Sequence, residues 1–113
     1  MRNKKWLLIE QLDKKLKPFQ KTEMVLVPSK GWINTIRTAF NMTMAQLGTK
    51  LGVTKQGVHK IEESEAKGSI SLNSLKEVGN VLDLKLVYSF VPKEGTFEKL
   101  IDVKAEKMAR KII

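Results

Sequence analysis

Residues 43–62, TMAQLGTKLGVTKQGVHKIE, constrain the fold more than any other feature of the chain. Two of the threonines and one of the glycines in this stretch mark where helices begin and end. Thr43 begins one short helical pattern, and Gln46 stands three residues later, as in a capping box. Thr54 begins a second pattern in the same way. Gly52 lies between the two patterns and accepts the positive φ that a tight turn requires. The stretch therefore predicts two short helices joined by a sharp turn.

The residues between these signals have the types that two crossing helices require. Gly48 is the fifth residue of the first helix, where only a small side chain lets the helices approach. The positions that the two helices must bury together are all apolar, namely Leu47, Leu51, Val53, Val58 and Ile61. Such spacing is typical of a helix-turn-helix, whose second helix enters the major groove of DNA.

The second helix has one apolar face and one polar face. At the helical period, Val58 and Ile61 share a face. Four polar residues gather on the opposite side, namely Gln56, His59, Lys60 and Glu63. Glutamine can pair with adenine, and lysine can donate to the N7 and O6 acceptors of guanine. The apolar face is expected to anchor the helix, while the polar face is available to read bases.

Amphipathic patterns on both sides of the motif complete a mainly helical chain. Helices are expected over residues 3–17 and 96–112, and further helices within residues 31–82. Residues 84–91 alternate in polarity and predict a strand. This strand could pair with MVLVP at residues 24–28 or with a second copy of the chain, and the sequence leaves both open. We expect one domain over residues 1–113.

Charge and composition limit the classes of function. The 113 residues carry a net charge of +9, with +4 in residues 1–23 and +3 in residues 24–53. Such an excess favours a polyanionic partner. The chain has no cysteine and no apolar run long enough to cross a membrane. We therefore expect a cytoplasmic protein without a membrane segment, a metal, a cofactor or an enzymatic activity.

Other residues have simpler structural interpretations. His59 and Glu63 could offer two metal ligands, but a third is missing. The acidic pair Glu62 and Glu63 is expected to be a solvated patch at the helix end. Three aromatic residues are expected in the core, namely Trp6, Trp32 and Phe97.

The motif resembles the lambda-repressor and Cro type of helix-turn-helix across residues 31–82. This resemblance implies that residues 54–65 form the recognition helix. Met44 departs from the glutamine that often braces this helix on a phosphate. Thr43, Gln46 and Lys50 would then do more of the backbone clamping. The expected DNA-binding residues are Thr43, Gln46, Lys50, Thr54, Lys55, Gln56, His59 and Lys60.

A second resemblance covers more of the chain. The stretches Gly31–Arg37, Glu62–Leu75 and Leu86–Pro92 are similar to the family called mobile mystery protein A. Members of that family lie beside mobile mystery protein B, which has a Fic domain. The resemblance implies a repressor of its own operon with an antitoxin-like role. The alternative is an interaction protein that neutralises a Fic-domain partner directly and binds DNA secondarily.

The two resemblances and the patterns together give one expected architecture. It is a mainly α, lambda repressor-like helix-turn-helix domain with an added N-terminal helix, an edge strand or strand pair near residues 84–91, and a C-terminal helix. We expect a homodimer on a palindromic double-stranded DNA operator, because two recognition helices would then meet successive major grooves. Strand 84–91 and helix 96–112 are the expected dimerisation elements.

Overall fold

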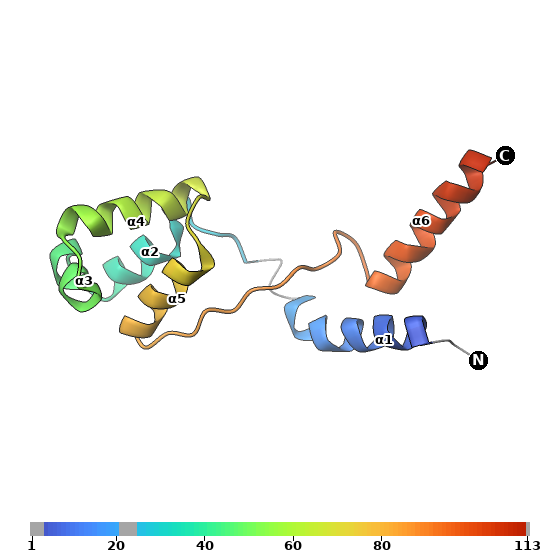
Figure 1. The fold of residues 1–113 in the computed structure, drawn as a ribbon, viewed down its shortest axis with the longest axis horizontal. Helices are drawn as coiled ribbons and strands as arrows, with labels where there is room; N and C mark the ends of the chain where they lie inside the picture. Colours follow the sequence, from blue (N-terminus) through green and yellow to red (C-terminus); the bar gives the residue numbers. More distant parts are fainter. Residues whose placement is uncertain (1–3, 21–24, 113) are drawn as a thin grey trace. The chain divides into compact units, whose positions relative to one another are not determined.

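A computed structural model describes residues 4–20 and 25–112 and groups the chain into two compact units (Figure 1). One unit is Leu26–Val87, and the other joins the N-terminal segment to the residues from Tyr88 onward. The described residues are mainly helical, as the sequence predicts. That the whole chain behaves as one domain stays a prediction. Each unit is described by itself below.

The unit Leu26–Val87 consists of four helices, which begin and end near the predicted signals. They are α2 (Gly31–Ala39), α3 (Met44–Leu51), α4 (Lys55–Lys67) and α5 (Leu72–Val81). Thr54 Oγ1 accepts a hydrogen bond from Gly57 N at 3.0 Å, which satisfies one free N–H of the first turn of α4. Gly68 ends α4 in the left-handed conformation at φ 80°.

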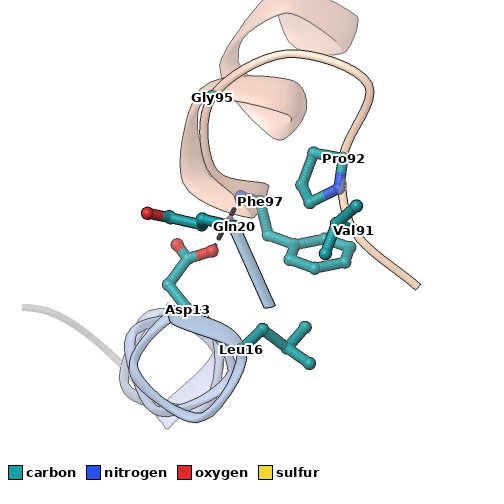
Figure 2. A pocket seen from close by; sticks show the side chains of 7 residues that line it. All are labelled: Asp13, Leu16, Gln20, Val91, Pro92, Gly95 and Phe97. Atoms are coloured by element: carbon teal, nitrogen blue, oxygen red, sulfur yellow. Dashed lines mark hydrogen bonds between the residues drawn. The ribbon is translucent and has the colours of Figure 1, made fainter. Parts of the chain in front are cut away.

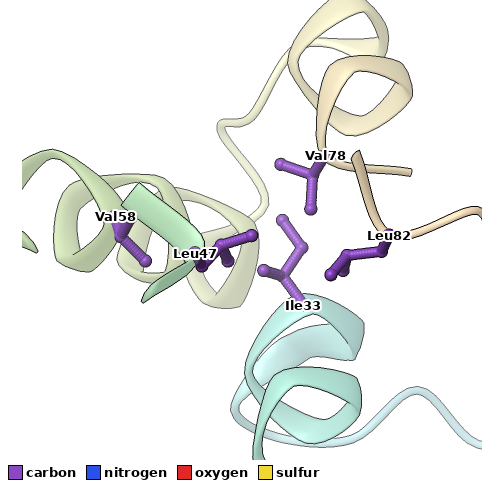
Figure 3. Close-up of a cluster of buried hydrophobic side chains, with 5 residues drawn as sticks. All are labelled: Ile33, Leu47, Val58, Val78 and Leu82. Atoms are coloured by element: carbon purple, nitrogen blue, oxygen red, sulfur yellow. The ribbon is translucent and has the colours of Figure 1, made fainter. Parts of the chain in front are cut away.

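The core of this unit draws one side chain from each helix and one from the C-cap of α5 (Figure 3). Its buried apolar residues are Ile33, Leu47, Val58, Val78 and Leu82. Two predictions about burial are wrong. Val53 is 41% exposed, because it lies in the turn between α3 and α4 and not on either apolar face. Trp32 is 40% exposed, because it lies in the first turn of α2 and is not part of the buried core cluster.

The second unit contains α1 (Lys4–Leu16), a 3-10 turn over Lys17–Gln20, and α6 (Phe97–Ile112). Asp13 joins the two helices, since its carboxylate accepts hydrogen bonds from Phe97 N at 2.8 Å and Glu98 N at 3.3 Å (Figure 2). A side chain of α1 thereby caps the positive end of α6. Trp6 and Phe97 are partly buried, so the interpretation of both as core residues stays a prediction.

The prediction of a strand over residues 84–91 is wrong. No strand is found among the described residues, and neither this segment nor residues 25–28 belongs to a ladder. Met24, at the start of the other predicted strand, lies outside the described residues. Period-two alternation predicts which side chains share a face, but a strand also needs a partner that completes its hydrogen bonds. Residues 84–92 have the first property without the second.

Candidate nucleic-acid interface

Gly48 and Gly52 set the close crossing of α3 and α4. A Cβ atom at Gly48 would lie 2.6 Å from the carbonyl oxygen of Val53, so no larger residue fits there. Val53 N donates to Gly48 O at 2.9 Å across this contact. Gly52 ends α3 at φ 71°, the left-handed region that glycine adopts without strain. The sequence-based roles of both glycines are confirmed.

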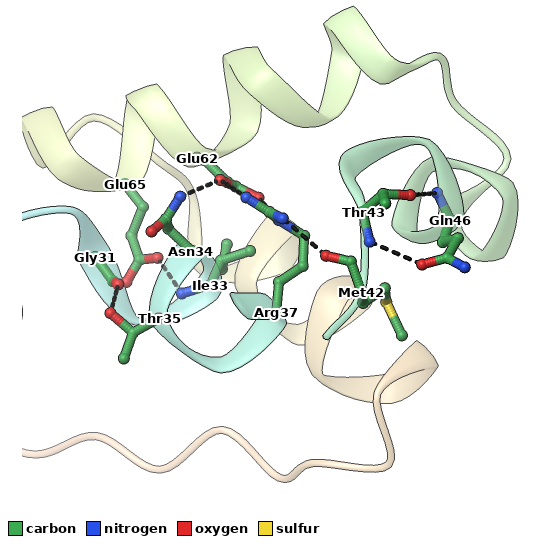
Figure 4. Close-up of polar contacts among 10 residues, drawn as sticks. All are labelled: Gly31, Ile33, Asn34, Thr35, Arg37, Met42, Thr43, Gln46, Glu62 and Glu65. Carbon is green, nitrogen blue, oxygen red and sulfur yellow. Dashed lines mark hydrogen bonds and ion pairs between the residues drawn. The ribbon is translucent and has the colours of Figure 1, made fainter. Parts of the chain in front are cut away.

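The capping box at the start of α3 forms as predicted (Figure 4). Gln46 N donates to Thr43 Oγ1 at 3.1 Å, and Thr43 N donates to Gln46 Oε1 at 2.8 Å. The amide oxygen of Gln46 is therefore occupied by the helix end, while its amide nitrogen remains a donor. A phosphate oxygen is the kind of acceptor that such a donor would serve.

The helix α4 is buried on one side and exposed on the other. Val58 is fully buried, whereas Lys55, Gln56, His59 and Lys60 are exposed. Thr43, Gln46, Lys50 and Thr54 are exposed on α3 or at the helix starts. All eight predicted DNA-binding residues thus lie on α3, α4 or their caps, with side chains open to solvent. Their contacts with DNA stay a prediction.

Glu63 adds one acidic group to this polar face. It lies 3.6 Å from His59 Nε2 and 2.6 Å from Lys67 Nζ. The hydrogen bond from Lys67 and its charge lower the pKa of Glu63. Within the described residues, no group of three or more histidine, aspartate or glutamate side chains is placed to hold a metal.

The prediction that Glu62 belongs to a solvated patch is wrong. Glu62 is buried, and its carboxylate accepts hydrogen bonds from Arg37 Nε at 2.6 Å and Asn34 Nδ2 at 2.7 Å (Figure 4). Arg37 also donates to Met42 O at 2.8 Å. Burial raises the pKa of Glu62, but the hydrogen bonds from Arg37 and Asn34 and the guanidinium charge lower it further, so the net shift is downward. This ion pair fastens α4 to α2.

Glu65 makes a second connection between the same helices. Its carboxylate accepts hydrogen bonds from Trp32 N and Ile33 N, each at 2.8 Å. Lys30, the N-cap residue of α2, makes no side-chain capping bond, so Glu65 of α4 supplies the cap across the unit. Gly31 is buried at φ 86° beside this carboxylate.

Sequence reasoning missed both acidic connections, although the helical period contains a signal for them. At 100° per residue, Glu62 and Glu65 lie within about 40° of Val58, on the buried face of the helix. A carboxylate on a buried face requires a partner, because an unpaired buried charge is costly. The partners stand 25 to 33 residues away, and no local rule identifies them.

An exposed polar helix, held against a second helix by a tight glycine turn, is the geometry of a helix-turn-helix. Proteins with this motif are regulators that bind double-stranded DNA. A helix-turn-helix family of the XRE, lambda repressor-like type matches residues 33–89, just over half of the chain, and the chain belongs to this family. No curated protein and no solved structure matches the chain. Among the described residues, no helix has the length and apolar character needed to span a lipid bilayer.

Proposed function

We propose that this chain is a sequence-specific transcriptional repressor of its own operon. The observation that carries the proposal is the division of α4, with Val58 fully buried on one side and four exposed polar side chains on the other. Two acidic anchors, Glu62 and Glu65, hold that helix to α2 from its buried side. A recognition helix fixed in this way meets the groove in one orientation, which base-specific contacts require.

The electrostatics of the chain agree with this proposal. Residues 24–53, which include α2 and α3, have three basic side chains and no acidic one. Such a surface attracts phosphates without regard to sequence. The polar face of α4 then supplies the sequence-dependent part of binding. Lys50 is expected to contribute to the phosphate contacts, which do not depend on sequence, and Gln56 to the base contacts, which do.

Gln56→Ala and Lys50→Ala separate these two contributions. Gln56→Ala should cost about 1–3 kcal/mol of binding free energy on the operator and much less on random duplex DNA. Lys50→Ala should weaken both duplexes alike and reduce the dependence of affinity on salt. Fluorescence titrations of both variants at two salt concentrations give the answer. An equal loss on both duplexes for Gln56→Ala would mean that α4 reads no bases.

We propose further that the protein binds its operator as a two-fold dimer. The segment 84–91 supports this, because it belongs to no helix and has no ladder partner among the described residues. Val87 and Tyr88 are 65% and 60% exposed within it. An exposed apolar segment of this kind invites pairing with another chain. Two copies related by a two-fold axis would bring recognition helices about 34 Å apart, the spacing of successive major grooves.

Val87→Glu tests the dimer. The variant should be a monomer with unchanged helical content, and its operator affinity should fall on the order of 100-fold, since only one half-site is then engaged. Asn73→Glu on α5 makes the same change of charge away from the segment and should leave both properties unchanged. Light scattering and a DNA titration of the same samples measure them. A wild-type protein that stays monomeric at tens of micromolar and still binds its operator tightly would contradict the proposal.

The antitoxin-like role and the Fic-domain partner rest on the resemblance of Gly31–Arg37, Glu62–Leu75 and Leu86–Pro92 to mobile mystery protein A. The sequence speaks against direct inhibition of a Fic active site and leaves neutralisation through another surface open. The inhibitory pattern Ser/Thr-x-x-x-Glu-Gly/Asn does not occur, since Phe90 precedes Glu94 and Gly95 at the required position. A Fic-coding reading frame beside this gene would support the role.

A further inference from the structure

The unit that contains α1 and α6 has an apolar groove beside the first two turns of α6. The groove has a volume of about 620 Å³ and lies between residues 90–94 and the first two turns of α6. Phe90, Phe97, Leu100 and Val103 supply its apolar surface. Phe90 is 88% exposed there, although it is one of the largest apolar side chains of the chain. An apolar surface of this kind is typical of a binding site.

The rim of the groove is basic. Lys93, Lys99 and Lys104 line it, and Glu94 is the only acidic residue among those that do. The charges of α6 are segregated to match. With Leu100 as the reference, Lys104 lies about 40° away and Lys99 about 100° away, whereas Asp102 lies about 160° away, on the opposite side. The groove thus combines an apolar floor with a positive edge.

From this arrangement we infer that the groove binds an acidic amphipathic helix of a partner protein. An amphipathic helix can lay its apolar face into such a groove, while acidic side chains at its borders meet the lysines of the rim. A helix with side chains is about 10–12 Å across, and volumes of several hundred Å³ are ordinary for binding sites. The interaction is separate from the DNA-binding residues, which all belong to the other unit.

Three other occupants fit less well. A second copy that docked here with the same groove would place one lysine rim against another, and the dimer proposed above relies on Val87 and Tyr88, which do not line the groove. Nucleic acid would pair with the lysines, and a base could stack on Phe90 or Phe97, but it brings no apolar side chain to cover Leu100 and Val103. A membrane surface takes up a protruding apolar face, whereas these apolar residues line a hollow between two segments.

Two designed peptides test the inference on the full-length protein. Both are helices of about 16 residues with leucine on one face, and the remaining positions are glutamate in one peptide and lysine in the other. We expect fluorescence anisotropy to show binding of the glutamate peptide, with the lysine peptide at least about tenfold weaker. Lys99→Glu with Lys104→Glu should weaken the glutamate peptide about tenfold and strengthen the lysine peptide.

Lys4→Glu with Lys5→Glu is the matched control, because both lysines are exposed on α1 of the same unit and neither lines the groove. It should leave both peptide affinities unchanged. Circular dichroism checks that each variant keeps the helical content of the wild type, to which α1 and α6 contribute. If the charge reversal unfolds the unit, Lys99→Gln with Lys104→Gln replaces it and should weaken the glutamate peptide by a smaller factor in the same direction.

Four results would overturn the inference. The first is equal affinity for the two peptides, and the second is peptide affinities that the Lys99 and Lys104 variants do not change. The third is loss of self-association in a Leu100→Glu variant. The fourth is binding of phosphatidylglycerol vesicles that depends on these lysines, in the absence of peptide binding. The third would assign the groove to a second copy, and the fourth would assign it to a membrane surface.

Discussion

Glu62→Ala should lower the free energy of unfolding by about 3 kcal/mol, because it leaves the guanidinium of Arg37 buried without its counter-charge. The Glu62 side chain is 5% exposed and that of Arg37 is 11% exposed, so water cannot replace the lost partner easily. Asn34 loses its acceptor as well. Because the pair fastens α4 to α2, operator affinity should fall together with stability.

The same pair predicts a dependence of stability on pH. The pKa of Glu62 lies below its ordinary value of 4.5 in the folded protein. A carboxylate with a lowered pKa in the folded state stabilises that state fully above its unfolded pKa, and the contribution is lost as the pH falls through the folded pKa. The difference between wild type and Glu62→Ala should therefore be largest at neutral pH and shrink below about pH 4.3.

Urea denaturation of both proteins at pH 7 and at low pH measures these effects. Glu63→Ala is the matched control, because Glu63 is the neighbouring acidic residue but is exposed and pairs with Lys67. Its unfolding midpoint should be close to that of wild type at both pH values. Replacing both partners, Arg37→Met with Glu62→Leu, should restore most of the stability that Glu62→Ala loses. If Glu62→Ala unfolds at the wild-type urea concentration, α4 is held by other contacts.

Local rules predicted the helix-turn-helix well, because its signals need no distant partner. Thr43 and Thr54 cap with their own first turns, and Gly52 adopts its positive φ within the turn itself. The reading face of α4 follows from the helical period and needs only Val58 as a reference. Each of these features depends only on residues within a few positions of it in the sequence.

The features that sequence reasoning missed depend on contacts between distant residues. Glu62 and Glu65 are stabilised by groups on α2, and only the folded unit brings those groups to them. The prediction of a strand over residues 84–91 failed in the opposite way. The alternation of polar and apolar residues satisfies the local rule for a strand, but no partner strand is found among the described residues. Helical caps are local and strand pairing is not, so the helices were predicted better than the strand.

Gly31→Ala should destabilise the protein by about 2–3 kcal/mol, through two effects at one position. Gly31 has φ 86°, where an L side chain is strained by roughly 1–2 kcal/mol. Its new Cβ atom would also lie 2.7 Å from Glu65 Oε1, so the carboxylate must move away from Trp32 N and Ile33 N. Loss of that cap adds about 1 kcal/mol.

A double-mutant cycle distinguishes the two effects. Glu65→Ala removes the cap and opens the space beside Gly31, so Gly31→Ala in that background should cost only the backbone strain. Thermal unfolding of wild type, the two single variants and the double variant gives the coupling, which we expect near 1 kcal/mol. Gly68→Ala is the control for strain alone, because Gly68 has φ 80° and nothing within 4 Å of an added Cβ. Strict additivity of the two changes would mean that the added Cβ atom at Gly31 does not displace the Glu65 carboxylate, and the cost of Gly31→Ala would then be backbone strain alone.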